Sequence, residues 1–180
     1  AGNSPSNIRK PKSVGRPLPG VKVTVREGEI FVQSPSLMQG YVDPATKRIS
    51  ELPRDHWFAT GDLGELDADG NVLITGRRKD LIIRGGLNIS PRLIEEVILQ
   101  HPAVEQVAVV GIPHADFGEE IIAVLQLKKG LALKTEEKSI ADWCRQNLSR
   151  SSLPGKFRQI DRCPTGPTGK VLKAKVREQL

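Results

Sequence analysis

The sequence predicts an α+β protein in which a small β-rich part precedes a compact α+β part with a short central sheet flanked by helices. Three observations support this prediction. Residues 1–79 contain short runs of alternating apolar and polar side chains separated by glycine turns, which is typical of hairpins. Residues 80–180 combine near-continuous apolar strands with helical periodicity. A charged stretch, Arg77 to Asp80, lies where the two textures meet.

In residues 1–79, the alternation of apolar and polar side chains predicts two hairpins. The first pairs residues 21–25 with 30–32, and the second pairs residues 63–66 with 72–75. Glu27-Gly28 and Asp69-Gly70 are the predicted turns, because glycine accepts a positive φ without steric cost. Residues 43–55 are charged and contain two prolines, so we expect a polar loop there. The first thirteen residues are polar and predict a flexible arm.

In residues 80–180, apolar runs predict strands at 81–83, 104–112, 121–127 and 157–160. Ser90-Pro91 is a good helix start, and His101-Pro102 ends that helix. Its predicted inner face consists of Leu93, Ile94, Val97 and Ile98. Two further helices are predicted at 135–148, with Ile140, Trp143, Cys144 and Leu148 facing inward, and at 169–180.

Composition places the chain of 180 residues among ordinary globular proteins, with 38% apolar residues, 17 Gly and 13 Pro. No apolar run approaches the ~20 residues of a membrane-spanning helix, and the first residues lack the apolar core of a signal peptide. Cys144 and Cys163 do not make a disulfide framework, so we expect a cytoplasmic protein.

The net charge of +6 fits a nucleic acid, a membrane surface or a phosphorylated small molecule as partner. Residues 156–180 form the densest basic stretch, with seven Lys and Arg against Asp161 and Glu178. The whole chain holds four Phe, two Trp and one Tyr, too few for a stacking platform for single-stranded nucleic acid. We therefore expect no nucleic-acid binding and interpret the basic stretch as a solvated helix face.

Several motifs can be set aside by spacing. An EF-hand needs Gly at its sixth position and Glu at its twelfth; counted from Asp67, Gly is fourth and Arg78 is twelfth. A P-loop containing Gly169-Lys170 would need Gly where Pro164 stands and Ser or Thr where Val171 stands. The three histidines have no ligand spacing, so no metal site is predicted. The sequence also lacks the GxSxG of an esterase nucleophile.

Three segments suggest more than turns and linkers. Asp62 follows Gly61 at a strand edge, where a carboxylate either forms a turn or accepts two hydrogen bonds from vicinal hydroxyls, as acids do with ribose. Residues 76–80 with Gly85-Gly86 are either a charged linker and a glycine turn or part of a site. Residues 164–170 form a Pro/Gly loop that delivers Lys170 to a predicted helix start, where the helix dipole opposes a cation and an anionic ligand would offset that cost. The simpler interpretation of Lys170 is a solvated side chain.

Taken in order, these segments resemble the adenylate-forming superfamily of acyl- and aryl-CoA synthetases, peptide-synthetase adenylation domains and luciferases. The matching segments are PSLMQGY at 35–41, TGDLG at 60–64, GRRKDLI at 76–82, GGLNISP at 85–91, EEV at 95–97, HPAV at 101–104, VVGIP at 109–113, GE at 118–119 and PTGKV at 167–171. The family's Gly/Ser/Thr-rich phosphate loop and Tyr-Gly-x-Thr-Glu motif do not occur in this sequence, and the hairpin at Glu27-Gly28 is shorter than in relatives.

The resemblance implies a two-step reaction, in which a carboxylate attacks the α-phosphate of ATP and a thiol then displaces AMP from the acyl-adenylate. It implies that Asp62 binds the ribose hydroxyls, that Arg77 contacts the nucleotide, and that Lys170 contacts carboxylate and phosphate oxygens during adenylation. Lys170 would act by stabilising charge rather than by transferring a proton.

The resemblance also implies two domains and a hinge. Residues 1–79 correspond to a C-terminal β-rich piece of the large AMP-binding domain, and residues 80–180 to the complete small lid domain. Lys79 stands at the family's hinge position. Rotation there would withdraw Lys170 and bring the Gly85-Gly86 loop to the site, where the glycines leave room for the pantetheine arm of CoA.

The implied function is that of a C-terminal fragment of an ATP-dependent acid–thiol ligase, an acyl-CoA synthetase of fatty acid metabolism. ATP with Mg²⁺ is the implied cofactor of the parent enzyme, CoA the co-substrate, and a small carboxylic acid the other substrate; the upstream part of the same enzyme is an implied partner, and we expect the fragment alone to be inactive. Two alternatives stay open: a lid-like binding module, and an adenylation domain that loads a carrier protein. A homo-oligomer also stays open.

Overall fold

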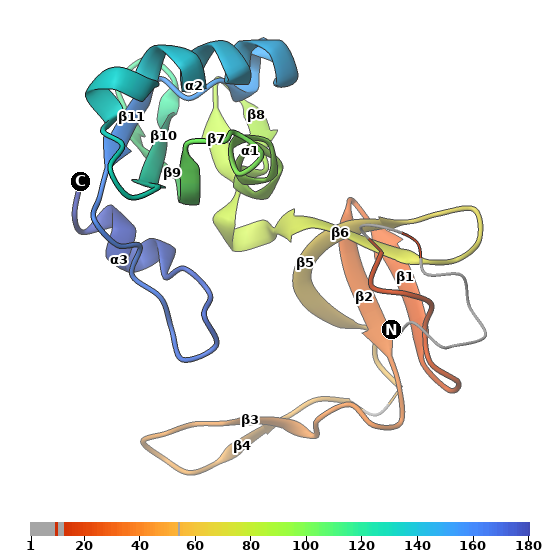
Figure 1. Ribbon diagram of the computed structural model, residues 1–180. Helices are drawn as coiled ribbons and strands as arrows, with labels where there is room; N and C mark the ends of the chain where they lie inside the picture. The colour runs from red at the N-terminus through yellow and green to blue at the C-terminus, as the bar shows by residue number, and fades with distance from the viewer. Residues whose placement is uncertain (1–9, 11–12, 54) are drawn as a thin grey trace. The chain divides into compact units, whose positions relative to one another are not determined.

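A computed structural model describes Lys10, residues 13–53 and residues 55–180 (Figure 1). The chain divides into two compact units, Ala1–Arg78 and Lys79–Leu180. The first is β-rich and the second combines a sheet with helices, so the predicted α+β class is confirmed. Of the helices in the described part of the chain, none has the length and apolarity needed to cross a membrane.

The first unit is built on a four-stranded antiparallel sheet of order β1-β2-β5-β6. Its strands are β1 (Lys22–Arg26), β2 (Glu29–Gln33), β5 (Phe58–Leu66) and β6 (Val72–Arg77). Both predicted hairpins are present. Glu27 and Gly28 have φ of 49° and 76°, and positive φ at both central residues is what a two-residue type I′ hairpin turn requires.

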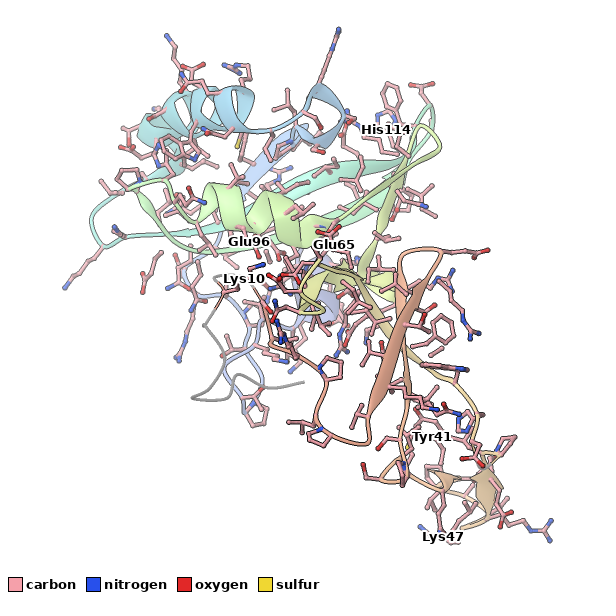
Figure 2. The ribbon with its side chains drawn as sticks, turned by 90° about the vertical axis from the view of Figure 1, so that its right-hand side faces the viewer. Lys10, Tyr41, Lys47, Glu65, Glu96 and His114 are labelled. Atoms are coloured by element: carbon pink, nitrogen blue, oxygen red, sulfur yellow. The ribbon has the colours of Figure 1, made fainter. Side chains whose placement is uncertain are left out.

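A third hairpin corrects the prediction of a polar loop at residues 43–55. Strand β4 (Ile49–Glu51) lies within that region and pairs with β3 (Gly40–Val42), which immediately precedes it, and Figure 2 shows Tyr41 and Lys47 on this hairpin. The carboxylate of Asp43 accepts the backbone N–H groups of Ala45 and Thr46, each at 2.8 Å, and so reverses the chain. Strands of three residues are too short for alternation to reveal them.

The end of the predicted flexible arm is bound to the sheet. Most of residues 1–13 lie outside the described residues, but Ser13 bridges to Leu73. The N–H of Val14 donates to the carbonyl of Val72 at 3.0 Å, and the N–H of Val72 donates to the carbonyl of Gly15 at the same distance. Residues 13–15 therefore pair with β6, which would otherwise have an open edge.

The sheet of the second unit is dominated by one long antiparallel pair, β9 (Val104–His114) and β10 (Gly118–Leu127). Strand β11 (Lys156–Gln159) runs parallel to β10. The predicted strand at 81–83 is the first half of a hairpin, β7 (Ile82–Arg84) with β8 (Leu87–Ile89), which meets β10 at the pair Arg84 and Gly118. Two short 3₁₀ helices, Arg78–Asp80 and Arg150–Ser152, complete the connections.

Helices cover both faces of this sheet (Figure 1). Against one face pack α1 (Pro91–Ile98) and α2 (Leu133–Asn147), and against the other packs α3 (Lys173–Arg177). Alternate β10 residues enter the two cores: Ile121, Ala123 and Leu125 on the side of α1 and α2, Ile122 and Val124 on the side of α3. Burial on both faces explains why β9 and β10 are near-continuously apolar in sequence.

Two helix predictions need correction. Leu93, predicted on the inner face of α1, is 49% exposed, whereas Ile94 and Ile98 are buried. The predicted helix over 169–180 is wrong in extent, since α3 covers only Lys173–Arg177. Gly169 has a φ of 76°, which is incompatible with a right-handed helix. Residues 164–172 are instead a closed loop.

We predict that the two units differ in local stability. The amides of Val107 to Val110, in the centre of the doubly covered sheet, should exchange hydrogen more slowly than those of Val23 and Val25, since β1 pairs with β2 alone and is only partly buried. Hydrogen exchange followed by NMR measures this. Equal protection of the two sets in monomeric protein would contradict it.

Candidate functional site

The TGD segment lies in a bulge of strand β5. Glu29 of β2 pairs with Leu63, and Phe31 pairs with Ala59, so Thr60 to Asp62 face Ile30 alone. Three residues on one strand therefore oppose one on the other, and the ordinary ladder of backbone hydrogen bonds is interrupted. The chain bends at this point, which is where the predicted ribose-binding acid stands.

Side chains replace the missing ladder bonds in this bulge. The Thr60 hydroxyl donates to the carbonyl of Ile30 at 2.8 Å and accepts the N–H of Asp62 at 3.1 Å. The N–H of Gly61 donates to Oε1 of Glu29 at 3.0 Å. Gly61 has a φ of 73°, a conformation that glycine adopts without strain. The TGD sequence thus supplies both the hydroxyl and the glycine that the bulge needs.

Asp62 and Arg77 lie together. They are partners across β5 and β6, and Nε of Arg77 is 2.9 Å from Oδ1 of Asp62. The Asp62 side chain is 26% exposed, so its carboxylate is held in place and still reaches solvent. A carboxylate in this setting can accept hydrogen bonds from a pair of vicinal hydroxyls, with the guanidinium close by for a phosphate.

Gly64, the last residue of the TGDLG segment, is required by close backbone packing. A Cβ at this position would lie 2.1 Å from the carbonyl oxygen of Leu73 and 2.7 Å from Cδ1 of Ile30. Any side chain here would push β5 away from β6. Gly64 therefore fixes the distance between the two strands that carry Asp62 and Arg77.

Glu29 is a residue of this region that sequence reasoning missed. Its Oε2 accepts Nη1 of Arg78 at 2.7 Å, and its side chain is only 5% exposed. Arg77 and Arg78 are thus each paired with an acid of the first unit. No local signal in the sequence marks Glu29, because its partners Gly61 and Arg78 are 32 and 49 positions away.

Lys79 follows the two paired arginines and is the first residue of the second unit. It lies in the 3₁₀ helix Arg78–Asp80 and is exposed. Among the described residues, no ion pair or hydrogen bond holds its side chain. The constraints on the arginine side chains therefore end where the second unit begins.

Gly85 and Gly86 form the turn of the β7–β8 hairpin. Their φ values are 56° and 78°, and no atom lies within 4 Å of a Cβ built on either one. Backbone conformation therefore explains these glycines, and the space beside them is open. The turn is anchored from behind: the N–H of Gly85 donates to the carbonyl of Phe117 at 2.8 Å, and Arg84 pairs with Glu120 at 3.2 Å.

Lys170 stands in the closed loop before α3, not at a helix start. Its carbonyl accepts the N–H of Gly166 at 2.8 Å, and the N–H of Leu172 donates to Pro164 at the same distance. The side chain is exposed, and the helix begins three residues later at Lys173. The predicted effect of a helix dipole on this cation is therefore wrong, and the hydrogen bonds of the loop define the position of Lys170.

An ion pair ties the Lys170 loop to the sheet. Nζ of Lys173 is 2.7 Å from Oε1 of Glu95, and each side chain is 18% exposed. The same carboxylate oxygen accepts the N–H of Val109 in β9 at 2.8 Å. Val176 in α3 is fully buried against β9 and β10. Sequence analysis did not identify Glu95 or Lys173 as a pair, since 78 residues separate them.

The predicted site residues are brought together in the first unit but not in the second. Asp62 and Arg77 are joined directly. In the second unit, no ion pair or hydrogen bond among the described residues joins the Gly85-Gly86 turn to Lys170. In the part of the chain that the structure describes, no group of three or more His, Cys, Asp or Glu is arranged to hold a metal ion.

The fold and the order of the motifs resemble the C-terminal part of adenylate-forming enzymes, and comparison with known proteins agrees. Residues 93–170 match the family described as the AMP-binding enzyme C-terminal domain.

Curated relatives agree in sequence. The chain is 40% identical over 162 residues to the sulfoacetate–CoA ligase of Cupriavidus necator, covering 90% of this chain and 31% of that protein. It is 38% identical over 186 residues to the putative acyl-CoA synthetase YngI of Bacillus subtilis, covering 97% of this chain and 34% of that protein. The chain therefore spans about a third of the length of these relatives.

Solved structures agree in fold. The crystal structure of ATP-bound MatB from Rhodopseudomonas palustris superposes with a TM-score of 0.85 at 37% identity, covering 98% of this chain and 37% of that one. The o-succinylbenzoate CoA synthetase of Bacillus subtilis, in complex with its acyl-adenylate intermediate, superposes with a TM-score of 0.78 at 32% identity. The match covers 92% of this chain and 35% of that one. These findings confirm the resemblance: residues 93–170 match the AMP-binding enzyme C-terminal domain, and the chain as a whole is similar in sequence and fold to the C-terminal part of adenylate-forming ligases.

We predict that the Lys173–Glu95 pair stabilises the Lys170 loop. Lys173→Met keeps the aliphatic stem but leaves Glu95 without its cation, and should lower the free energy of unfolding by about 1–3 kcal/mol, the usual range for a largely buried group that loses its partner. Urea denaturation measures this. Lys175→Met, an exposed lysine of the same helix, is the control and should have little effect. Equal free energies of unfolding for the two variants would contradict the prediction.

Proposed function

We propose that this chain is the nucleotide-binding and lid part of an ATP-dependent acid–thiol ligase that makes acyl-CoA thioesters. The observation that carries the proposal is the ion pair between Asp62 and Arg77, which is held at a bulge supported by side chains. The hinge candidate Lys79 and the Gly85-Gly86 turn follow Arg77 in the sequence. The names of the relatives support it, since they include a sulfoacetate–CoA ligase and a medium-chain acyl-CoA ligase. MatB was crystallised with ATP bound.

In the first proposed step, a carboxylate oxygen of the acid attacks the α-phosphorus of ATP, the bond to the pyrophosphate oxygen breaks, and acyl-AMP forms. ATP enters as its Mg²⁺ complex, and the ion belongs to the substrate. Asp62 accepts hydrogen bonds from the ribose hydroxyls, and Arg77 places its guanidinium near the phosphates. Lys170 brings a positive charge to the oxygens on which negative charge develops in the transition state.

In the second proposed step, the thiol sulfur of CoA attacks the acyl carbonyl, the bond to AMP breaks, and the thiol proton leaves to solvent. Lys170 has no role in this step, because rotation at Lys79 withdraws its loop. The Gly85-Gly86 turn takes its place, and the open space beside both glycines accommodates the pantetheine arm. Separate conformations for the two half-reactions let one site serve both.

The acceptor and the setting of this reaction are also part of the proposal. CoA is preferred over a carrier protein because the relatives compared above are CoA ligases and acyl-CoA synthetases by name. The mouse and rat medium-chain enzymes favour an aliphatic acid and a place in fatty acid metabolism. A reducing, cytoplasmic setting is proposed because Cys144 and Cys163 are both free and buried. Burial raises the pKa of the Cys144 thiol to about 11, which makes it unreactive.

The 180-residue chain alone is expected to form no acyl-adenylate. Its sequence lacks the family's phosphate loop and Tyr-Gly-x-Thr-Glu motif. Incubation with ATP, a panel of carboxylic acids and radiolabelled pyrophosphate should therefore give no exchange of label into ATP. Exchange with any acid of the panel would show that the chain carries a complete adenylation site.

In a full-length ligase that contains this chain, Lys170→Ala should slow adenylation by ~10²–10³, the usual effect of removing a group aimed at transition-state charge. Thioester formation from preformed acyl-adenylate should be little changed. Lys79→Pro is the matched comparison: it restricts φ at the hinge and should slow the second step more than the first. Pyrophosphate exchange and CoA-dependent thioester formation measure the two steps separately.

If Lys170→Ala is as slow in thioester formation as in exchange, the lysine is not specific for adenylation. If Lys79→Pro leaves thioester formation untouched, the hinge is elsewhere in residues 77–80.

A further inference from the structure

Glu29 stands out because it is a buried acid in a unit with little core. It is 4% exposed, and it is the only acidic residue among the buried residues that the structure describes. A carboxylate is removed from water at substantial cost unless hydrogen bonds and a counter-charge replace its solvation. Both are present here, and the two come from different segments of the chain.

Each oxygen of Glu29 has its own partner. Oε1 accepts the backbone N–H of Gly61 at 3.0 Å, and Oε2 accepts Nη1 of Arg78 at 2.7 Å. Gly61 immediately precedes Asp62, and Arg78 lies between Arg77 and Lys79. One side chain therefore connects the acid proposed for ribose with the residues proposed for phosphate contact and for the hinge.

The bulge depends on this connection. The N–H of Gly61 has no partner in the β2–β5 ladder, because Thr60 to Asp62 all lie opposite Ile30. Without the carboxylate, that N–H would lose its hydrogen bond and the strand could slip to recover ladder bonds. A slip of one residue turns each side chain to the opposite face of a sheet. The direction of Asp62 is thus sensitive to Glu29, although the two side chains make no direct contact.

We infer that Glu29 is a positioning residue for nucleotide recognition: its carboxylate holds the bulge so that Asp62 faces the ribose hydroxyls, and holds Arg78 in place beside the hinge. This inference rests on the proposed function. Glu29 does not touch the nucleotide, so its effect passes through Asp62 and depends on the presence of the ribose hydroxyls.

The test compares ATP with 2′,3′-dideoxy-ATP in pyrophosphate exchange by a full-length ligase that carries this chain. The quantity measured is the preference for ATP, expressed as the ratio of kcat/KM values for the two nucleotides. Glu29→Ala should reduce this preference by about tenfold, mainly by raising KM for ATP. The kcat/KM for 2′,3′-dideoxy-ATP should stay within about twofold of the wild-type value, because that nucleotide has no ribose hydroxyls for Asp62 to bind.

A second variant guards against misfolding. Glu29→Asp keeps the charge, but its shorter side chain cannot reach both Gly61 and Arg78, so the preference for ATP should fall by more than about twofold. Glu65→Ala removes an exposed acid from β5, the strand that carries Asp62, and is the control that should leave the preference unchanged (Figure 2).

Asp62→Ala separates failure of the inference from failure of the proposed function. If Asp62→Ala does not reduce the preference for ATP, the proposed ribose contact is wrong. If Asp62→Ala reduces it and Glu29→Asp leaves it unchanged, the positioning role of Glu29 is wrong. Equal losses on both nucleotides in the Glu29 variants would also overturn it, because a purely structural role lowers activity without regard to the hydroxyls.

Discussion

The first unit depends on one constraint, the interruption of its central strand pair at Thr60 to Asp62. A bulge of three residues against one removes backbone groups from the ladder, and buried backbone groups must be paired. The unit meets this requirement with side chains: the Thr60 hydroxyl serves Ile30 and Asp62, and the Glu29 carboxylate serves Gly61. Gly64 then lets β5 return to close contact with β6. The motif residues beside Asp62 therefore serve the backbone first, because they allow strand β5 to leave and rejoin the sheet. The role proposed for Asp62 depends on the conformation that these neighbours maintain.

The second unit meets a different constraint, because its central sheet is covered on both faces. Alternate residues of β9 and β10 enter separate cores, so the middle of both strands is apolar. The proposed functional groups of this unit lie instead on connections anchored to that pair. The Gly85-Gly86 turn is held by the carbonyl of Phe117, which lies between β9 and β10. The Lys170 loop is held by α3, which is fixed through Val176 and the Lys173–Glu95 pair. The β9–β10 pair is thus the common support for both loops.

Local sequence signals predicted the features that depend on neighbours in the chain. The β1–β2 and β5–β6 hairpins followed from alternation and glycine turns, and α1 from Ser90-Pro91. What escaped prediction depends on distant partners. Glu29 is recognisable only once β2 is known to face Gly61, and Glu95 only once α3 is known to reach α1. The predicted helix over 169–180 was too long, because the backbone groups of Lys170 and Leu172 form hydrogen bonds that close the loop instead of hydrogen bonds of a helix. For the proposed site, residue types could be assigned by resemblance, whereas the residues that support them could not.

The pattern of ion pairs gives a physical reason to place the proposed hinge at one residue rather than across the whole charged stretch. Arg77 and Arg78 are adjacent and both cationic, yet each is bound to a different acid of the first unit, Asp62 at 2.9 Å and Glu29 at 2.7 Å. Moving either arginine would break a charge-assisted hydrogen bond, and for Glu29 would leave a buried carboxylate without its counter-ion. Lys79 carries the same charge and no such bond among the described residues. The proposed rotation about its backbone dihedrals would therefore break no ion pair of the Lys79 side chain within the described residues, and Lys79 is also the first residue of the second unit.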